Sequence, residues 1–199
     1  MARRPPVHDV TSASEMAAVV FPVRQEILDV LAGLRRGSVA EIAATLGTAP
    51  DALYYHVKAL VKCGLVLPAG ERGAGRSREA LYETVSPVMR LRYKPSSSAR
   101  NRGVSRIVGS MLRLADRDFK RSLAAADARV EGGARELWAW RAIGWLEPEG
   151  IARLNAKIRS LHRAASRPRG RGRLYAVTLV LVPLDRRRRK EKPRAKSTP

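Results

Sequence analysis

The segment SVAEIAATLGTAPDALYYHVKALVKCGLV, residues 38–66, decides the fold of this chain. It contains two apolar stripes at helical spacing; the first ends at Leu46 and the second begins at Leu53. Gly47 and Pro50 separate the stripes. Glycine is favoured just beyond the end of a helix, and proline is favoured in the first turn of the next one. The segment therefore predicts two short helices joined by a tight turn.

The flanking sequence extends this pattern on both sides. Before it, apolar residues at helical spacing predict helices at about 13–20 and 22–34, and Ser38 is placed to cap the helix that ends at Gly47. The second helix of the segment, at about 50–64, is followed by two apolar runs within 65–85 that flank a Gly- and Arg-rich tip, which is typical of a β-hairpin. Three helices and a hairpin in this order indicate a winged helix-turn-helix.

Four motifs carry a family resemblance: PVRQEIL at 22–28, VAEIAATLG at 39–47, YYHVKAL at 54–60 and CGLV at 63–66. Together they resemble the ArsR-like winged helix-turn-helix transcriptional regulators over residues 14–86. The resemblance implies a DNA-binding domain whose histidine, here His56, is largely structural. It also favours repression over activation.

The charge of the chain points to a polyanionic partner. Its 199 residues include 39 Lys and Arg against 18 Asp and Glu, a formal net charge of +21. Such an excess is tolerated when the protein binds nucleic acid. Charge alone leaves open a non-specific architectural DNA-binding protein or an RNA-associated basic protein. A winged helix that binds only proteins would need neither this charge nor an arginine-rich wing.

Burial of the apolar stripe turns the opposite face of the third helix outward, where it would enter the major groove of double-stranded DNA. The predicted contacts of this recognition helix are Thr48, Pro50, Asp51, Tyr54, Tyr55 and Lys58, and those of the wing are Arg72, Arg76 and Arg78. Amides at the helix start can approach phosphate. Asp51 accepts from a cytosine amino group or complements the helix N-terminus. Either tyrosine could instead pack under the wing.

The remaining sequence predicts an overall α+β chain: a disordered basic arm at 1–12, the DNA-binding domain at 13–88, a linker at 89–100, a small α+β dimerisation and effector domain at 101–185, and a disordered basic tail at 186–199. Within the fourth segment the pattern predicts a helix at 104–124 that packs against a second copy, a strand at 137–145, a helix from Pro148 to Leu161 and a strand at 174–183.

Three tryptophans stand close together in the second half of the chain. They either fill the core of the C-terminal domain or line a pocket for a small-molecule effector, and they are Trp138, Trp140 and Trp145.

Other functional classes lack support in the sequence. The chain has one cysteine and three scattered histidines, so no metal site is expected. No nucleophile motif or phosphate-binding loop is present, so neither catalysis nor a cofactor is expected. The first ten residues hold no apolar stretch of signal-peptide length, and the longest apolar run, around Leu174 to Leu184, is far shorter than a membrane span. We therefore expect a cytoplasmic, nucleoid-associated, non-enzymatic regulator that binds DNA as a homodimer.

Overall fold

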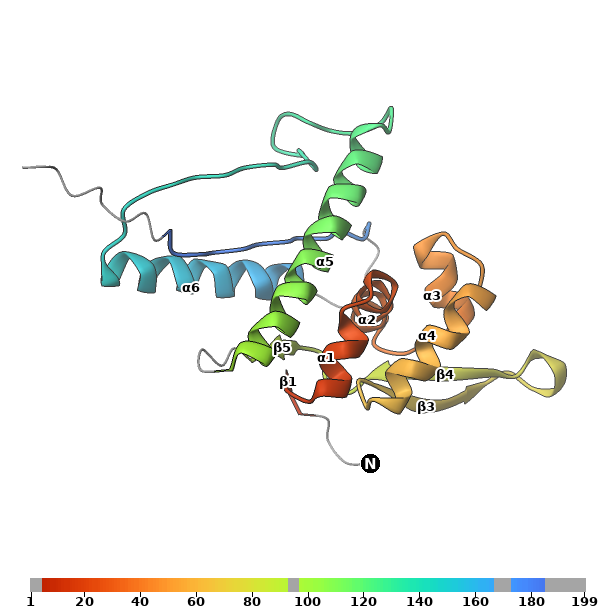
Figure 1. Ribbon diagram of the computed structural model, residues 1–199. Coiled ribbons are helices and arrows are strands. Elements are labelled where there is room, and N and C mark those ends of the chain that lie inside the picture. The colour runs from red at the N-terminus through yellow and green to blue at the C-terminus, as the bar shows by residue number, and fades with distance from the viewer. Residues whose placement is uncertain (1–4, 93–96, 167–172, 185–199) are drawn as a thin grey trace, which may run out of the picture.

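The computed structural model describes residues 5–92, 97–166 and 173–184, except for the side chain of Arg76. Figure 1 shows the arrangement of the helices and strands. In chain order they are β1 (His8–Val10), α1 (Ala13–Val19), α2 (Pro22–Leu34), β2 (Gly37–Ser38), α3 (Val39–Leu46), α4 (Asp51–Lys62), β3 (Val66–Arg72), the short 3₁₀ helix η1 (Gly75–Ser77), β4 (Glu79–Thr84), β5 (Met89–Leu91), α5 (Ser98–Leu123) and α6 (Pro148–Ala165).

The helical core forms where the apolar stripes predicted it. Helices α2, α3 and α4 pack on one another through fully buried side chains, among them Ile27, Leu31, Ile42, Leu53 and Leu60. The start of α3 is fixed by a capping box, in which the Glu41 amide donates to Ser38 Oγ and the Ser38 amide donates to Glu41 Oε2. The predicted helices at 13–20, 22–34, 38–47 and 50–64 are all confirmed to within a few residues.

The predicted hairpin is part of a three-stranded antiparallel sheet in the order β2-β4-β3. The two-residue strand β2 was not predicted; it pairs Gly37 with Tyr82 and so joins the start of α3 to the hairpin. The register of β3 shifts between Pro68 and Glu71, because proline has no amide hydrogen to donate to the ladder. At the tip, Gly73 has a φ of +87°, and an added Cβ would lie 2.3 Å from the Ser77 carbonyl oxygen.

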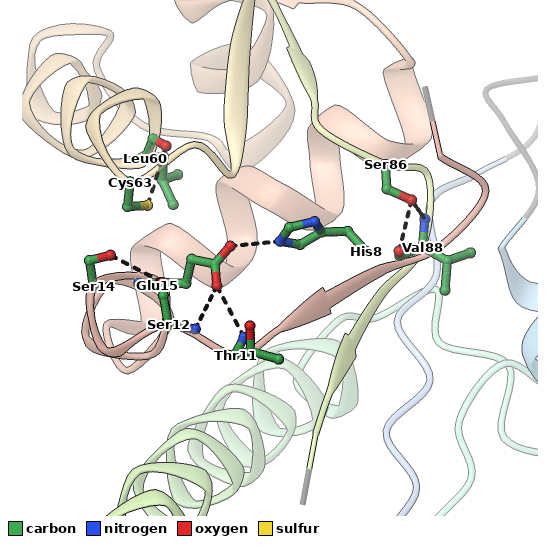
Figure 2. Close-up of polar contacts among 9 residues, drawn as sticks. All are labelled: His8, Thr11, Ser12, Ser14, Glu15, Leu60, Cys63, Ser86 and Val88. Atoms are coloured by element: carbon green, nitrogen blue, oxygen red, sulfur yellow. Dashed lines mark hydrogen bonds and ion pairs between the residues drawn. The ribbon is translucent and has the colours of Figure 1, made fainter. Parts of the chain in front are cut away.

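The predicted disordered arm at 1–12 is wrong for residues 8–12. Strand β1 pairs in parallel with β5, and Ser12 caps α1. Figure 2 shows Glu15 accepting a hydrogen bond from His8 at 2.6 Å and others from the backbone amides of Thr11 and Ser12. These contacts attach the chain before α1 to the helical core, and the sequence pattern gave no sign of them because the two strands lie far apart in the chain.

The boundary between the two predicted domains also differs. Helix α5 begins at Ser98, inside the predicted linker, and its first half docks on α1 and α2. Val104, Ile107 and Ser110 are buried there. Gly103 allows the close approach, since an added Cβ would lie 2.4 Å from Met16 Cε. This half of α5 therefore belongs to the N-terminal core and is not free to pack on a second copy.

The C-terminal strands are absent from the described residues. Residues 137–147 and 173–184 are extended without strand pairing, so both predicted strands are wrong for a single chain. The helix predicted from Pro148 is present as α6, but none of its residues is buried. Trp138, Trp140 and Trp145 are 70%, 85% and 95% exposed, so they do not fill a core within this chain. The predicted tail at 186–199 lies outside the described residues.

The docking of α5 predicts a measurable stability difference. Ile107→Ala should lower the free energy of unfolding by about 2–5 kcal/mol, because it opens a cavity between α5 and the helical core. Arg106→Ala, at the exposed neighbouring position, should change it by less than about 0.5 kcal/mol. Urea unfolding followed by circular dichroism measures both. Equal, small effects of the two substitutions would show that α5 does not contribute to the core.

Candidate nucleic-acid interface

Helix α4 is held by one face and presents the other to solvent. Leu53, Val57 and Leu60 are buried in the core. On the opposite side the side chains of Asp51 and Lys58 are exposed, together with those of two tyrosines. Tyr54 is 47% and Tyr55 71% exposed, so two neighbouring aromatic side chains lie at the surface. Neither ring is therefore packed out of solvent, and all four side chains predicted from this helix lie on its open side.

The turn before α4 is set by its backbone. Gly47 ends α3 in the left-handed region with φ of +67°, and the Thr48 amide closes the turn by donating to the Ala43 carbonyl at 3.0 Å. Thr48 and Pro50 are exposed beside the helix start. Two amides of the first turn, those of Ala52 and Leu53, already donate to the carbonyls of residues 49 and 50. They are thus less available to phosphate than the sequence suggested.

The predicted wing is the hairpin formed by β3, η1 and β4. It lies next to the exposed side of α4. Tyr54 and Arg78 line one hollow of about 120 Å³, together with Glu79 and Tyr82 of β4 and residues 38–40 at the start of α3. The hollow brings a residue of α4 and a residue of the hairpin to the same surface, as predicted for a recognition helix and a wing. The two residues lie far apart in sequence. The antiparallel sheet brings their elements together, because β2, directly before α3, pairs with β4.

The wing arginines have carboxylate partners that the sequence analysis missed. Arg72 lies 3.2 Å from Glu41 of α3 and 3.0 Å from Glu79, while Arg78 Nε lies 3.3 Å from Glu71. The side chain of the third predicted wing residue, Arg76, lies outside the described part of the structure. The pair with Glu41 crosses 31 positions of sequence and depends on the docking of the wing against α3.

Arg24 of α2 is a buried cation that supports the exposed face of α4. It is 7% exposed, and its guanidinium carbon lies 4.4 Å from the ring centre of Phe21 and 5.8 Å from that of Tyr55. These are cation–π distances. The sequence carried a signal for this residue, because Arg24 precedes Ile27 and Leu28 at the three- and four-residue steps of the buried stripe.

His56 has a structural environment. Its ring packs edge-on against Tyr55 at 5.5 Å, and its buried Nδ1 has no hydrogen-bond partner among the described residues. Burial and the positive charge of Arg24 lower the pKa of His56 below its ordinary value of 6.5. The lowered pKa favours the neutral ring, which packs against Tyr55.

Other kinds of site find no support in the described residues. They contain no group of three or more His, Cys, Asp or Glu side chains placed to hold a metal ion. The single thiol, Cys63, donates to the Leu60 carbonyl at 3.3 Å. None of the described helices combines the length and hydrophobicity needed to cross a membrane.

Comparison with known proteins matches the segment that contains α2, α3 and α4. A family profile described as a helix-turn-helix domain matches residues 22–68, from α2 to the start of β3. The chain therefore contains a helix-turn-helix domain. A solved structure titled "Structure of the transcriptional regulator homologue protein from Pyrococcus horikoshii OT3" is 21% identical, with 50% of this chain and 86% of that chain covered and a TM-score of 0.31. That TM-score is too low to support an argument. No curated protein matches the chain.

The environment of His56 predicts a pH dependence of stability. The pKa of His56 is lowered in the folded chain. Between that lowered pKa and pH 6.5, the unfolded chain therefore binds a proton at His56 and the folded chain does not. The contribution of this residue to the free energy of unfolding should be lost as the pH falls from 6.5 to the folded pKa. Urea unfolding at pH 7.5 and 5.5 measures the loss as the difference between the unmodified chain and a variant that lacks His56, because the raised pKa of Asp29, about 6, gives an opposite dependence in this range.

The matched variants isolate the residue responsible. His56→Gln should reduce the difference between the two pH values, whereas His162→Gln, at an exposed position on α6, should leave it unchanged. An unaltered difference in the His56→Gln variant would assign the pH dependence to other groups.

Proposed function

We propose that this protein is a sequence-specific, DNA-binding transcriptional regulator that inserts α4 into the major groove. One observation carries the proposal: the helix-turn-helix presents an exposed face of α4, with Tyr54 and Tyr55 at its centre, beside a basic wing. Large exposed aromatic side chains on such a helix are suited to contact with base edges and thymine methyl groups.

The proposed contacts divide by chemistry. The tyrosine hydroxyls and rings face base edges, and the ammonium of Lys58 pairs with phosphate. Thr48 and Pro50 bring the helix start close to the DNA backbone. Asp51 accepts from a cytosine amino group or stabilises the N-terminus of α4, and both roles fit its exposed place in the first turn.

The wing would bind phosphate by partner exchange. The ion pairs of Arg72 and Arg78 are solvent-exposed, with side-chain exposures of 54% and 63%. Exposed ion pairs contribute only about 0–1 kcal/mol, so exchanging a carboxylate for a phosphate costs little. Arg76 belongs to the same proposed group by its position in η1.

Regulation is proposed at the level of a homodimer. Two helix-turn-helix domains about one helical turn apart would read a near-palindromic site on chromosomal DNA in the cytoplasm. The resemblance of residues 14–86 to ArsR-like regulators favours a repressor. An effector pocket at Trp138, Trp140 and Trp145 would require a second copy to enclose it, since all three side chains are exposed in the single chain.

A second candidate function is an architectural or RNA-associated protein. The net charge of +21 favours it, because charge alone produces tight, salt-sensitive binding to any nucleic acid. The two functions differ in sequence discrimination, which only contacts to base edges or to sequence-dependent DNA shape provide.

Selection from a random duplex pool at physiological salt tests the proposal. The full chain should enrich one near-palindromic motif. Tyr54→Ala combined with Tyr55→Ala should weaken binding to that motif by roughly 10- to 100-fold, since each base contact contributes about 1–3 kcal/mol. Tyr54→Phe combined with Tyr55→Phe keeps the rings and separates the hydroxyl contribution. An unenriched pool, with equal affinity for duplex DNA and RNA, would support the second candidate instead.

A further inference from the structure

Two extended segments of the C-terminal region follow similar paths. Residues 137–147 and 173–184 run in the same direction in Figure 1, and α6 returns between them along the chain. Their starts are held together by Tyr175, whose hydroxyl donates to Glu136 at 2.6 Å, and by Arg173, 3.5 Å from the same carboxylate. This is the path of a strand, a helix and a second parallel strand.

The backbone of neither segment is paired with a strand in the described part of the chain, although the Leu137 carbonyl accepts a hydrogen bond from Arg135 Nε at 2.7 Å. Among the described residues, no backbone hydrogen bond joins one segment to the other or to another strand. The one backbone–backbone hydrogen bond that either segment makes is accepted by the Glu147 carbonyl, at the start of α6. Unpaired strand edges recruit other strands. Both segments are also rich in β-branched and aromatic residues, which favour strands.

Most apolar side chains of these segments are exposed. From 174 to 184 the sequence LYAVTLVLVPL has no charged residue, and the consecutive residues 179–182 are all 45–56% exposed. An unbroken apolar run is typical of a strand that is covered on both faces. The chain's three tryptophans lie in the other segment and are 70–95% exposed. With aromatic side chains burying about 150–250 Å² each, these three alone offer roughly 500 Å², against about 800 Å² per partner in a stable interface.

We propose that a second copy of this chain completes a β-sheet with residues 137–147 and 173–184, with the apolar stripe of α6 covering one face of that sheet. The stripe, which includes Leu154 and Ile158, is half-buried or exposed in the single chain. This inference rests on the homodimer of the proposed function and locates its interface.

A second copy fits these segments better than other partners. The charged residues of the two segments are Arg141, Glu147 and Arg173, which are too few and of mixed sign, so neither nucleic acid nor an oppositely charged protein finds a complementary surface. Each copy supplies the same unpaired edges and the same apolar side chains, which is the requirement for a symmetric, self-complementary interface. The helix-turn-helix is left outside this interface, free to bind DNA.

The chain contains its own reporter for the test. All three of its tryptophans belong to 137–147, so tryptophan emission reports directly on this interface. Sedimentation and emission spectra are measured together over a dilution series of the full chain. We expect the mass of two copies with blue-shifted emission at high concentration, and a red shift that follows dissociation on dilution.

Paired substitutions at Val180 test the strand itself. Val180→Pro removes an amide hydrogen and should raise the dissociation constant at least about tenfold. Val180→Thr keeps the amide and the β-branch and should retain dimerisation within about threefold. Hydrogen exchange of the unmodified chain gives a second readout, in which amides of 174–184 should be protected in the dimer and lose protection on dilution.

Contrary outcomes are equally definite. The mass of one copy at all concentrations would overturn the proposal. A dimer whose tryptophans stay water-exposed, or whose amides at 174–184 exchange freely, would place the interface elsewhere. Binding of the Val180→Pro variant to a single half-site isolates the proposed function: Tyr54- and Tyr55-dependent discrimination there would keep DNA recognition intact even if the intersubunit sheet proved wrong.

Discussion

Burial of one stripe of α4 is the constraint on which the rest of the DNA-binding surface depends. With Leu53, Val57 and Leu60 fixed against α2 and α3, the helix has one rotational setting, and that setting turns the tyrosines outward. A helix rotated by one residue would bury a tyrosine hydroxyl and expose leucine, at a cost of several kcal/mol. The capping box at Ser38 and the left-handed Gly47 then position the start of α4 relative to the wing.

Charge is distributed less simply than the total of +21 suggests. The wing arginines with described side chains are each paired with a carboxylate, and one of these pairs reaches back to α3. Arg24 is buried and faces aromatic rings instead of solvent. Such contacts hold the wing and Tyr55 in place before any ligand arrives, which reduces the entropy lost on binding. In the proposed function, specific recognition would depend on these positioned side chains, because bulk charge contributes affinity without sequence discrimination.

The two halves of the chain differ in whether they bury an apolar core of their own. Residues from β1 to the middle of α5 share one apolar core, whereas α6 and the extended segments around it have no buried side chain. Helix α5 connects them: Val104 and Ile107 lie in the core, while Leu112 and Leu123 are exposed. An intersubunit sheet beyond α5 would couple the separation of two DNA-binding domains to the packing of the C-terminal region, because α5 is a continuous rigid element.

The sequence by itself determined the elements whose signals are local. Helical periodicity, the Ser38 and Glu41 spacing, and the positions of Gly47 and Pro50 act within a few residues, so α1 to α4, the hairpin and the outward face of α4 were predictable. Tertiary structure decided whatever joins distant positions: the parallel pairing of β1 with β5, the Arg72–Glu41 pair, and the docking of α5 on α1 and α2. The apolar runs at 137–145 and 174–183 show the same division. Their composition favours strands, yet a strand exists only where a neighbour accepts its hydrogen bonds, and the single chain provides none among its described residues.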